Sequence, residues 1–393
     1  MENIVIAGIF LALLFNFVNG LNDAANSIAT VVATRVLTPL QAVLMAAFFN
    51  MAGPFIFTTV VAKTIGKGII ESGFLTTEVI LVGMSAAVFW VFISSYAGIP
   101  ISASHALVGG LIGSAIAFGG IGSVLWPSSD LFFRAVTMAA GGGICGAFIL
   151  SLTARGKGEE NWPEYTALGA LCGISLVIPA GVITGVLPVS GILAIIIFIV
   201  VSPTLGLISA YLLGMVIIRL FRNANSKWMN VIFSKLQVFS AAFYSIGHGS
   251  NDAQNAMGVI TALLVAAGIL SEFIVPAWVI IISGLAIALG TFLGGWRVVE
   301  TMGKKITKLR PYQGFCAETG GGVVLSFVTA FGVPVSTTHA ISGSIMGVGA
   351  TRGYSAVQWG IVRRIVAAWV LTIPLTATCS FAAFLAYRAI VGI

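Results

Sequence analysis

Long apolar segments follow one another along almost the whole chain, and few charged residues interrupt them. Four of the longest cover residues 79–96, 168–183, 192–218 and 276–294. Because a transmembrane α-helix needs about 20 residues, a chain of this length has room for about ten to twelve crossings. The pattern predicts an all-α polytopic membrane protein.

The composition agrees with a membrane setting, since 58% of the 393 residues are hydrophobic and only 8% are charged. A soluble domain carries about 25% charged residues, so the lipid bilayer is the expected solvent for most of the surface. The apolar run that begins at residue 4 leads directly into a polar motif. We therefore expect a first membrane span there and not a cleaved targeting segment.

The net charge of +7 does not indicate nucleic-acid binding, because the basic residues gather in short connections between apolar segments. Cytoplasmic loops of membrane proteins are enriched in Lys and Arg. The two basic connections are therefore predicted to face the cytoplasm. This prediction sets the orientation of the chain in the cytoplasmic membrane. The two connections contain Arg219, Arg222, Lys227 and Lys235, and then Arg297, Lys304, Lys305, Lys308 and Arg310.

Two polar motifs occur at matching places in the two halves of the chain. Asn-Gly-x-Asn-Asp-Ala-x-Asn at residues 19–26 corresponds to His-Gly-x-Asn-Asp-Ala-x-Asn at 248–255. Gly-Ile-Pro-Ile-Ser-Ala-Ser-His at 98–105 corresponds to Gly-Val-Pro-Val-Ser-Thr-Thr-His at 332–339, and a weaker match links Thr-Ile-Gly-Lys at 64–67 to Thr-Met-Gly-Lys at 301–304.

The connection around residues 58–78 is neutral, whereas its counterpart in the second half is strongly basic. This asymmetry predicts two copies of opposite orientation, which is an inverted-topology repeat. We expect a first repeat at 1–130, scaffold helices with a central cytoplasmic loop at 131–235, and a second repeat at 236–393.

The Asn-Asp motifs offer carboxylate and amide oxygens, the ligands that a small hard cation prefers. On a helix the two asparagines of each motif share a face, with the aspartate beside them. The candidate cation ligands are Asn22, Asp23 and Asn26 in the first copy and Asn251, Asp252 and Asn255 in the second.

The glycines at 20 and 249 suggest a break in each of these helices that frees backbone carbonyls for the same ion. The alternative is a cluster that only hydrogen-bonds two helices together. An ionised residue in hydrocarbon costs at least about 2.5–3.5 kcal/mol, and the chain places one at both equivalent positions.

The second motif predicts a re-entrant helical hairpin. Proline disfavours helix at the residue before it, so Ile99 and Val333 are expected to be extended. Ser102 and Ser336 are then N-cap candidates for the helices that follow, and a helix N-terminus inside the membrane is an anion site. Small residues packing at a helix kink are the alternative. The candidate oxyanion ligands are Asp23, Ser102, Ala103, Ser104, Asp252, Ser336, Thr337 and Thr338.

The remaining titratable residues in the motifs leave their roles open. His105 and His339 could gate the site, donate to the ligand or relay a proton, or they could pin each hairpin to a neighbour. His248 replaces Asn19 and is expected to make a local structural contact. Glu318 marks either a second cation site or a proton route, or it pairs with a basic loop.

Taken together, the doubled Gly-x-Asn-Asp-x-x-Asn and Pro-x-Ser-x-(Ser/Thr)-His motifs resemble those of the inorganic phosphate transporter family, the PiT-type permeases. The resemblance covers nearly the whole chain apart from its middle segment. It implies cation-coupled import of inorganic phosphate, by a homodimer with a moving transport domain. The Asp/Asn residues would bind cation and phosphate, and the hairpin hydroxyls would hold the phosphate. Members divide between sodium and proton coupling, and two oxygen-rich sites favour Na⁺ here.

Three other functions remain open from the residues. The cargo could be another oxyanion such as sulfate. The chain could instead be a membrane-embedded phosphatase or phosphotransferase, although no arginine lies inside any motif to clamp a phosphate during catalysis. A channel is a third possibility.

Overall fold

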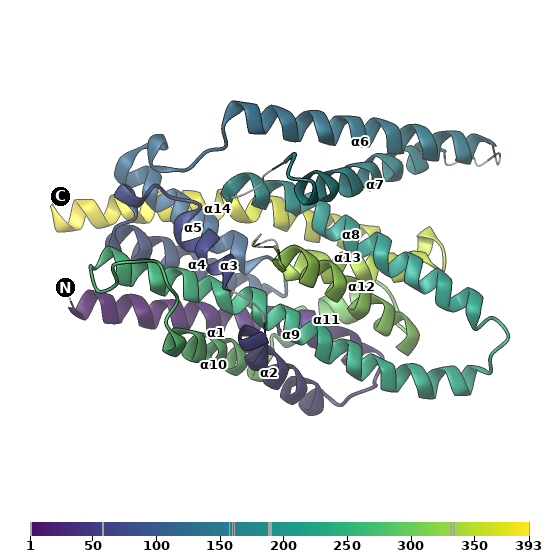
Figure 1. The fold of residues 1–393 in the computed structure, drawn as a ribbon. Helices are drawn as coiled ribbons and strands as arrows, with labels where there is room; N and C mark the ends of the chain where they lie inside the picture. Colours follow the sequence, from purple (N-terminus) through teal and green to yellow (C-terminus); the bar gives the residue numbers. More distant parts are fainter. Residues whose placement is uncertain are drawn as a thin grey trace.

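The computed structural model describes residues 2–56, 59–156, 158, 160, 162–187, 191–330, 332 and 335–392, and its elements are helices (Figure 1). The first half contains α1 (Glu2–Ala33), α2 (Pro39–Ile56), α3 (Val60–Lys67), α4 (Thr77–Ala97) and α5 (Ala103–Gly119), followed by α6 (Ser129–Gly156), α7 (Trp162–Ile183) and α8 (Gly191–Leu220). The second half contains α9 (Ser226–Ala266), α10 (Ala277–Leu293), α11 (Trp296–Glu300), α12 (Pro311–Ala330), α13 (Thr337–Ala350) and α14 (Trp359–Val391). A π-helical turn, Thr301–Lys305, continues α11.

The two repeats, α1–α5 and α9–α13, run in opposite directions and interlock. Helices α1 and α9 are antiparallel at the centre of the molecule (Figure 1). Each contacts the second helix of the other repeat, since α1 packs on α10 and α9 packs on α2. This exchange places the Asn-Asp motifs of both copies next to each other.

Seven helices within the described residues are long and apolar enough to cross a membrane, or eight if the bent pair α10 and α11 forms one span. This number is lower than the ten to twelve crossings that length alone suggested. Helices α5 and α13 are short arms of the hairpins, and α9 and α12 carry polar residues that lower their hydropathy. Large apolar side chains such as Phe10, Phe48 and Phe239 are exposed on the outside, as expected for contact with lipid.

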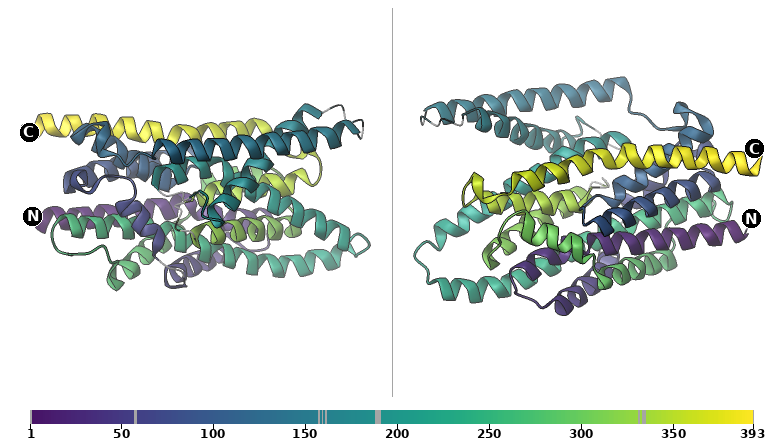
Figure 2. Two further views of the ribbon diagram at one scale, coloured as in Figure 1. Left: turned by 45° about the horizontal axis from the view of Figure 1, so that its top comes forward. Right: turned by 180° about the vertical axis from the view of Figure 1, so that it is seen from behind.

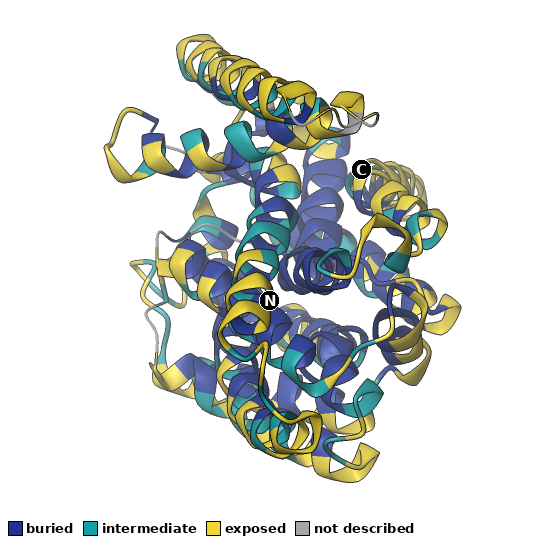
Figure 3. Ribbon diagram, turned by 90° about the vertical axis from the view of Figure 1, so that its right-hand side faces the viewer, coloured by how far each residue is buried: buried dark blue, intermediate teal, exposed yellow. Residues whose placement is uncertain are grey.

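The two hairpins, α4–α5 and α12–α13, enter the molecule from opposite ends (Figure 2). The N-termini of α5 and α13 meet in the interior, where Thr338 Oγ1 donates to Ile101 O at 3.0 Å. Scaffold helices hold each hairpin from outside: α14 packs on α5, and α8 packs on α13. Seen along the helices, buried residues gather around this meeting point and exposed residues form the outer surface (Figure 3). Helices α6 and α7 pack mainly on each other at the edge of the molecule.

Two helices cross the repeat boundaries that the sequence predicted, either in the chain or in their packing. Helix α9 begins at Ser226, before residue 236, and its N-terminal part precedes the polar motif. The terminal helix α14 falls in the predicted second repeat, but it packs against α5 of the first.

Candidate functional site

The Asn-Asp motifs lie on continuous helices. Both α1 and α9 pass through their motifs without interruption, so the predicted break at Gly20 and Gly249 is wrong. The glycines instead allow neighbouring helices to approach. A Cβ on Gly20 would lie 2.2 Å from the carbonyl oxygen of Ile287, and one on Gly249 would lie 2.1 Å from that of Asn50.

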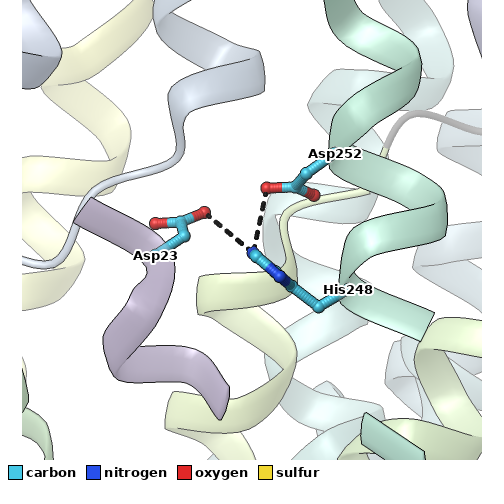
Figure 4. A group of neighbouring side chains, drawn as sticks. All are labelled: Asp23, His248 and Asp252. Carbon is cyan, nitrogen blue, oxygen red and sulfur yellow. Dashed lines mark ion pairs between the residues drawn. The ribbon is translucent and has the colours of Figure 1, made fainter. Parts of the chain in front are cut away.

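The two aspartates face each other across the centre of the molecule, with His248 between them (Figure 4). His248 Nε2 lies 3.4 Å from Asp252 Oδ2 and 3.9 Å from Asp23 Oδ2. Both carboxylates are 2% exposed, and their oxygens and the imidazole nitrogen all lie within 4.8 Å of one another. The inverted repeats thus place two carboxylates in one buried cluster.

His248 was expected to make only a local structural contact, and that expectation is wrong. Its other ring nitrogen, Nδ1, lies 3.1 Å from Asn50 Oδ1, and Asn50 Nδ2 donates to Thr291 Oγ1 at 2.9 Å. Because Thr291 Oγ1 donates its own proton to Ile287 O, it must accept from the Asn50 amide nitrogen. Asn50 Oδ1 therefore faces the ring, Nδ1 carries a proton, and Nε2 points at the carboxylates.

The hairpin turns have the capping geometry that the sequence predicts. Ser102 and Ser336 adopt extended backbone conformations, and their hydroxyl oxygens accept from the N–H groups of His105 and His339, both at 3.2 Å. Ile99 lies outside the helices, as expected, and Val333 falls outside the described residues. Two helix N-termini therefore open towards the same interior region.

Within the described residues, the backbone N–H groups of Ala103, Ser104, Thr337 and Thr338 have no backbone partner. The first N–H groups of any helix lack an intrahelical acceptor, so these four remain available to an anion. The N-termini carry partial positive charge. All four residues are at most 3% exposed.

The motifs of one repeat bond to the hairpin of the other. Asn26 Nδ2 donates to Thr337 Oγ1 at 3.1 Å and to Thr338 Oγ1 at 3.0 Å, and Asn255 Nδ2 donates to Ser104 Oγ at 2.8 Å. Thr338 Oγ1 in turn contacts Asp23 Oδ1 at 3.1 Å. The cation and oxyanion candidates of the two motifs thus form one site.

The other asparagine of each motif bonds within its own repeat. Asn22 Nδ2 donates to Ser95 Oγ at 2.7 Å in α4, and Asn251 Nδ2 donates to Thr329 Oγ1 at 2.9 Å in α12. Each of the four asparagines therefore uses its amide nitrogen to hold its position.

Their oxygens are left without partners. Among the described residues, the buried atoms with no hydrogen-bond partner include Oδ1 of Asn22, Asn26, Asn251, Asn255 and Asp252. A buried polar atom without a partner is costly. Cations held by these oxygens would satisfy all five, so the residues present fit the predicted cation sites.

His105 and His339 contact each other where the hairpin turns meet. Their ring centroids are 5.0 Å apart, and the His339 ring stacks on Trp369 of α14 at 4.0 Å. Trp369 Nε1 also donates to Pro100 O at 3.1 Å. One scaffold side chain therefore contacts both hairpins, which agrees with the pinning alternative for the histidines. A role in gating or proton relay stays a prediction.

Glu318 lies apart from the two aspartates, in a cluster of its own. It accepts hydrogen bonds from Thr30 of α1 and from Gln237 and Ser240 of α9. The predicted alternative of a basic loop partner is wrong, because Glu318 is fully buried among these neutral donors. Its counterpart in the first repeat, Met84, is buried among apolar residues.

Comparison with known proteins agrees with this architecture. The phosphate transporter family matches residues 19–165 and 163–380. The chain belongs to this family.

This chain has relatives of similar length among known proteins. It is 43% identical to a probable low-affinity inorganic phosphate transporter of Rhizobium meliloti (strain 1021), over 95% of both chains. It is 34% identical to a protein of the same description from Bacillus subtilis (strain 168), over 95% of this chain and 94% of the relative. Its fold is similar to a solved structure titled "The sodium-dependent phosphate transporter", with a TM-score of 0.70, 28% identity, and coverage of 99% of this chain and 100% of the other.

Membership of this family excludes the enzyme alternative: the chain is a multi-pass membrane transporter and not a phosphatase or phosphotransferase. The sequence had identified most residues that the structure brings together. It had missed Asn50, had given His248 only a local structural role, and had left the role of Glu318 open. One signal for His248 was present, since residues four apart on a helix share a face with each other, and His248 precedes Asp252 by that spacing.

Proposed function

We propose that this phosphate transporter imports inorganic phosphate by symport with sodium across the cytoplasmic membrane. Phosphate and sodium would bind together at the meeting point of the two repeats. The observation that carries this proposal is the pairing of two carboxylates, with free amide oxygens around them, against two helix N-termini. No other part of the described chain combines ligands for a cation and an anion in this way.

The electrostatics of the site explain why the two ligands should need each other. Two carboxylate oxygens within 4.8 Å repel each other in a buried place, and a phosphate anion would add further negative charge. No Lys or Arg lies within the Asn-Asp motifs or the hairpin motifs to compensate. Cations bound by the Asn and Asp oxygens would supply the missing positive charge, so that binding of either ligand favours the other.

For phosphate itself, the hairpins supply the ligands. The free N–H groups of the first turns of α5 and α13 and the hydroxyls of Ser104, Thr337 and Thr338 are donors suited to an oxyanion. Ser102 and Ser336 shape the two turns as N-caps. Asp23 and Asp252 would accept a hydrogen bond from a protonated phosphate, which sulfate at neutral pH cannot donate.

Sodium is favoured over the proton as the coupling ion for two reasons. The unsatisfied buried atoms among the described residues include Oδ1 of Asn22, Asn26, Asn251, Asn255 and Asp252, and such amide and carboxylate oxygens are hard ligands for a metal cation. The structurally similar transporter is described as sodium-dependent. Glu318 would form an additional cation site or a proton route, because its buried carboxylate contacts the same two helices, α1 and α9, that carry the aspartates.

The test is uptake of labelled phosphate into proteoliposomes under a sodium gradient alone and a proton gradient alone. We expect uptake with sodium and little with the pH gradient. Uptake driven by pH alone would overturn the sodium assignment. Sulfate and arsenate as competitors decide the cargo: sulfate that competes as well as phosphate would favour the alternative of a carrier for another oxyanion.

We also propose that the transporter works as a homodimer by alternating access, with the hairpins and the Asn-Asp helices moving against the scaffold helices. The exposed apolar faces of α6 and α7 are available for contact with a second copy or with lipid. The molar mass of the protein–detergent complex by light scattering, corrected for detergent, distinguishes a dimer from a monomer.

A further inference from the structure

A third repeated motif plays no part in the central site. The Thr-x-Gly-Lys segments lie at the end of α3 and in the π-helical turn after α11. Each one bonds to the hairpin of the opposite repeat in the same way. Thr64 Oγ1 donates to Gly332 O at 2.8 Å, and Thr301 Oγ1 donates to Gly98 O at 2.9 Å.

The glycines of the two segments also make equivalent contacts. A Cβ on Gly66 would lie 2.7 Å from Gly258 O in α9, and one on Gly303 would lie 2.7 Å from Ala29 O in α1. Each segment is thus held directly against the Asn-Asp helix of the other repeat, beyond its aspartate. The two copies of the motif are therefore alike in their contacts as well as in their amino-acid sequence.

A cavity opens beside each segment. One, of about 360 Å³, is lined by Lys67, Glu71 and the last turns of α9 at Ala262 and Ala266. The other, of about 260 Å³, is lined by Lys304, Glu300 and the last turn of α1 at Ala29 and Ala33. We call them the Lys67 vestibule and the Lys304 vestibule.

Helices α1 and α9 are antiparallel (Figure 1), so the two vestibules, each at the C-terminal turns of one of these helices, lie on opposite sides of the central site. Ala33 follows Asp23 along α1, and Ala262 follows Asp252 along α9, by the same number of residues. At 1.5 Å per residue, each vestibule is about 15 Å from an aspartate. The central site therefore has one vestibule on each side.

Both lysines are exposed and available. Among the described residues, neither one forms an ion pair with the glutamate of its vestibule, and Lys67 Nζ lies over the ring of Phe273 at 5.4 Å. A phosphate anion that approaches the central site is repelled by the two carboxylates until cations neutralise them. A lysine ammonium in the cavity on each side of the site would offset part of this repulsion.

We propose that Lys67 and Lys304 capture the phosphate anion, one at each face of the membrane, before it reaches the central site. The assignment rests on the proposed phosphate transport. On the orientation that the basic connections predict, Lys304 acts at the cytoplasmic face and Lys67 at the outer face.

The test compares the two faces separately. Initial rates of sodium-driven phosphate uptake are measured in whole cells, which expose the outer face, and in inverted membrane vesicles, which expose the inner face. Lys67→Gln should raise KM about three- to tenfold in cells and leave KM in inverted vesicles unchanged, with Vmax kept. Lys304→Gln should do the reverse. Each effect should shrink as ionic strength rises, since salt screens an exposed charge.

Matched controls are available on the same segments. Lys63 and Lys305 are exposed neighbours that do not line the vestibules, so Lys63→Gln and Lys305→Gln should leave both KM values unchanged. Lys67→Arg should restore the wild-type KM, whereas a folding defect would lower Vmax and would not be rescued. The inference is wrong if Lys67→Gln behaves like Lys63→Gln, or if one substitution raises KM equally at both faces. Absence of sodium-driven uptake by the wild-type protein would instead overturn the proposed function.

Discussion

Replacing one carboxylate of the central pair should uncouple phosphate affinity from sodium. Asp252→Asn keeps the shape of the side chain and removes its charge. In the wild-type site, two carboxylates have oxygens within 4.8 Å of each other and face the region where the hairpin N-termini would hold phosphate. A phosphate anion there needs a cation, and the variant reduces that need.

The magnitude follows from Coulomb's law. Two unit charges about 5 Å apart interact by about 3 kcal/mol at an effective dielectric constant of about 20, and coupling energies between two ligands are typically about 1–3 kcal/mol. We therefore expect wild-type protein to bind phosphate about 30- to 100-fold more tightly in sodium than in choline. In Asp252→Asn the ratio should fall to about threefold or less, partly because affinity without sodium improves.

The assay is equilibrium binding of labelled phosphate to purified protein in detergent, at equal ionic strength in sodium chloride and choline chloride. Asp130→Asn is the matched control. Asp130 is exposed on α6 and pairs with Arg134 at 2.9 Å, so its loss should leave the sodium dependence intact. The reasoning is refuted if Asp252→Asn keeps the full sodium dependence, or if the wild-type protein binds phosphate equally well in choline.

Three further results are expected. Asp23→Asn and Asp252→Asn should narrow the preference for phosphate over sulfate in competition assays, because the carboxylates can accept a hydrogen bond that phosphate donates and sulfate at neutral pH does not. If both variants keep the wild-type preference, this account of selectivity is wrong. Glu318→Gln should reduce sodium-driven uptake at least tenfold while phosphate binding in sodium changes less than about threefold, since Glu318 lies outside the central cluster; equal losses in binding and uptake would place it in the phosphate site. Thr64→Val should remove one hydrogen bond, worth about 1 kcal/mol, and raise the rate at which an impermeant maleimide labels Ala262→Cys about fivefold in a cysteine-free background; an unchanged labelling rate would show that this bond does not restrain the vestibule.

Much of the site could be predicted because its signals are local in the sequence. Each hairpin helix starts at a serine two residues after a proline, and that pattern alone predicted the N-caps at Ser102 and Ser336. The Asn-Asp motifs were recognisable because charged residues are costly in apolar segments. Duplication then indicated that the two copies act together.

Other features depend on the helix that comes to lie opposite, which the local sequence does not reveal. Gly20 could break a helix or let another helix approach, and only the position of Ile287 on α10 decides between these roles. The tautomer of His248 depends on Asn50 and Thr291, from two further helices. In the same way, the partners of Glu318 come from α1 and α9, so its separation from the aspartates could not be read from α12 alone.

The symmetric contacts of the Thr-x-Gly-Lys segments bear on how the site opens. Thr64 bonds to Gly332 at one end and Thr301 bonds to Gly98 at the other, and both bonds are present together while Asp23 and Asp252 are 2% exposed. The site is therefore closed at both ends in this arrangement. Each bond holds the turn of a hairpin against the opposite repeat, so release of one hairpin requires its bond to break while the other persists. Because a hydrogen bond contributes only about 1 kcal/mol net, the two end states should differ little in energy, and a modest difference in ligand affinity between them is enough to shift the population.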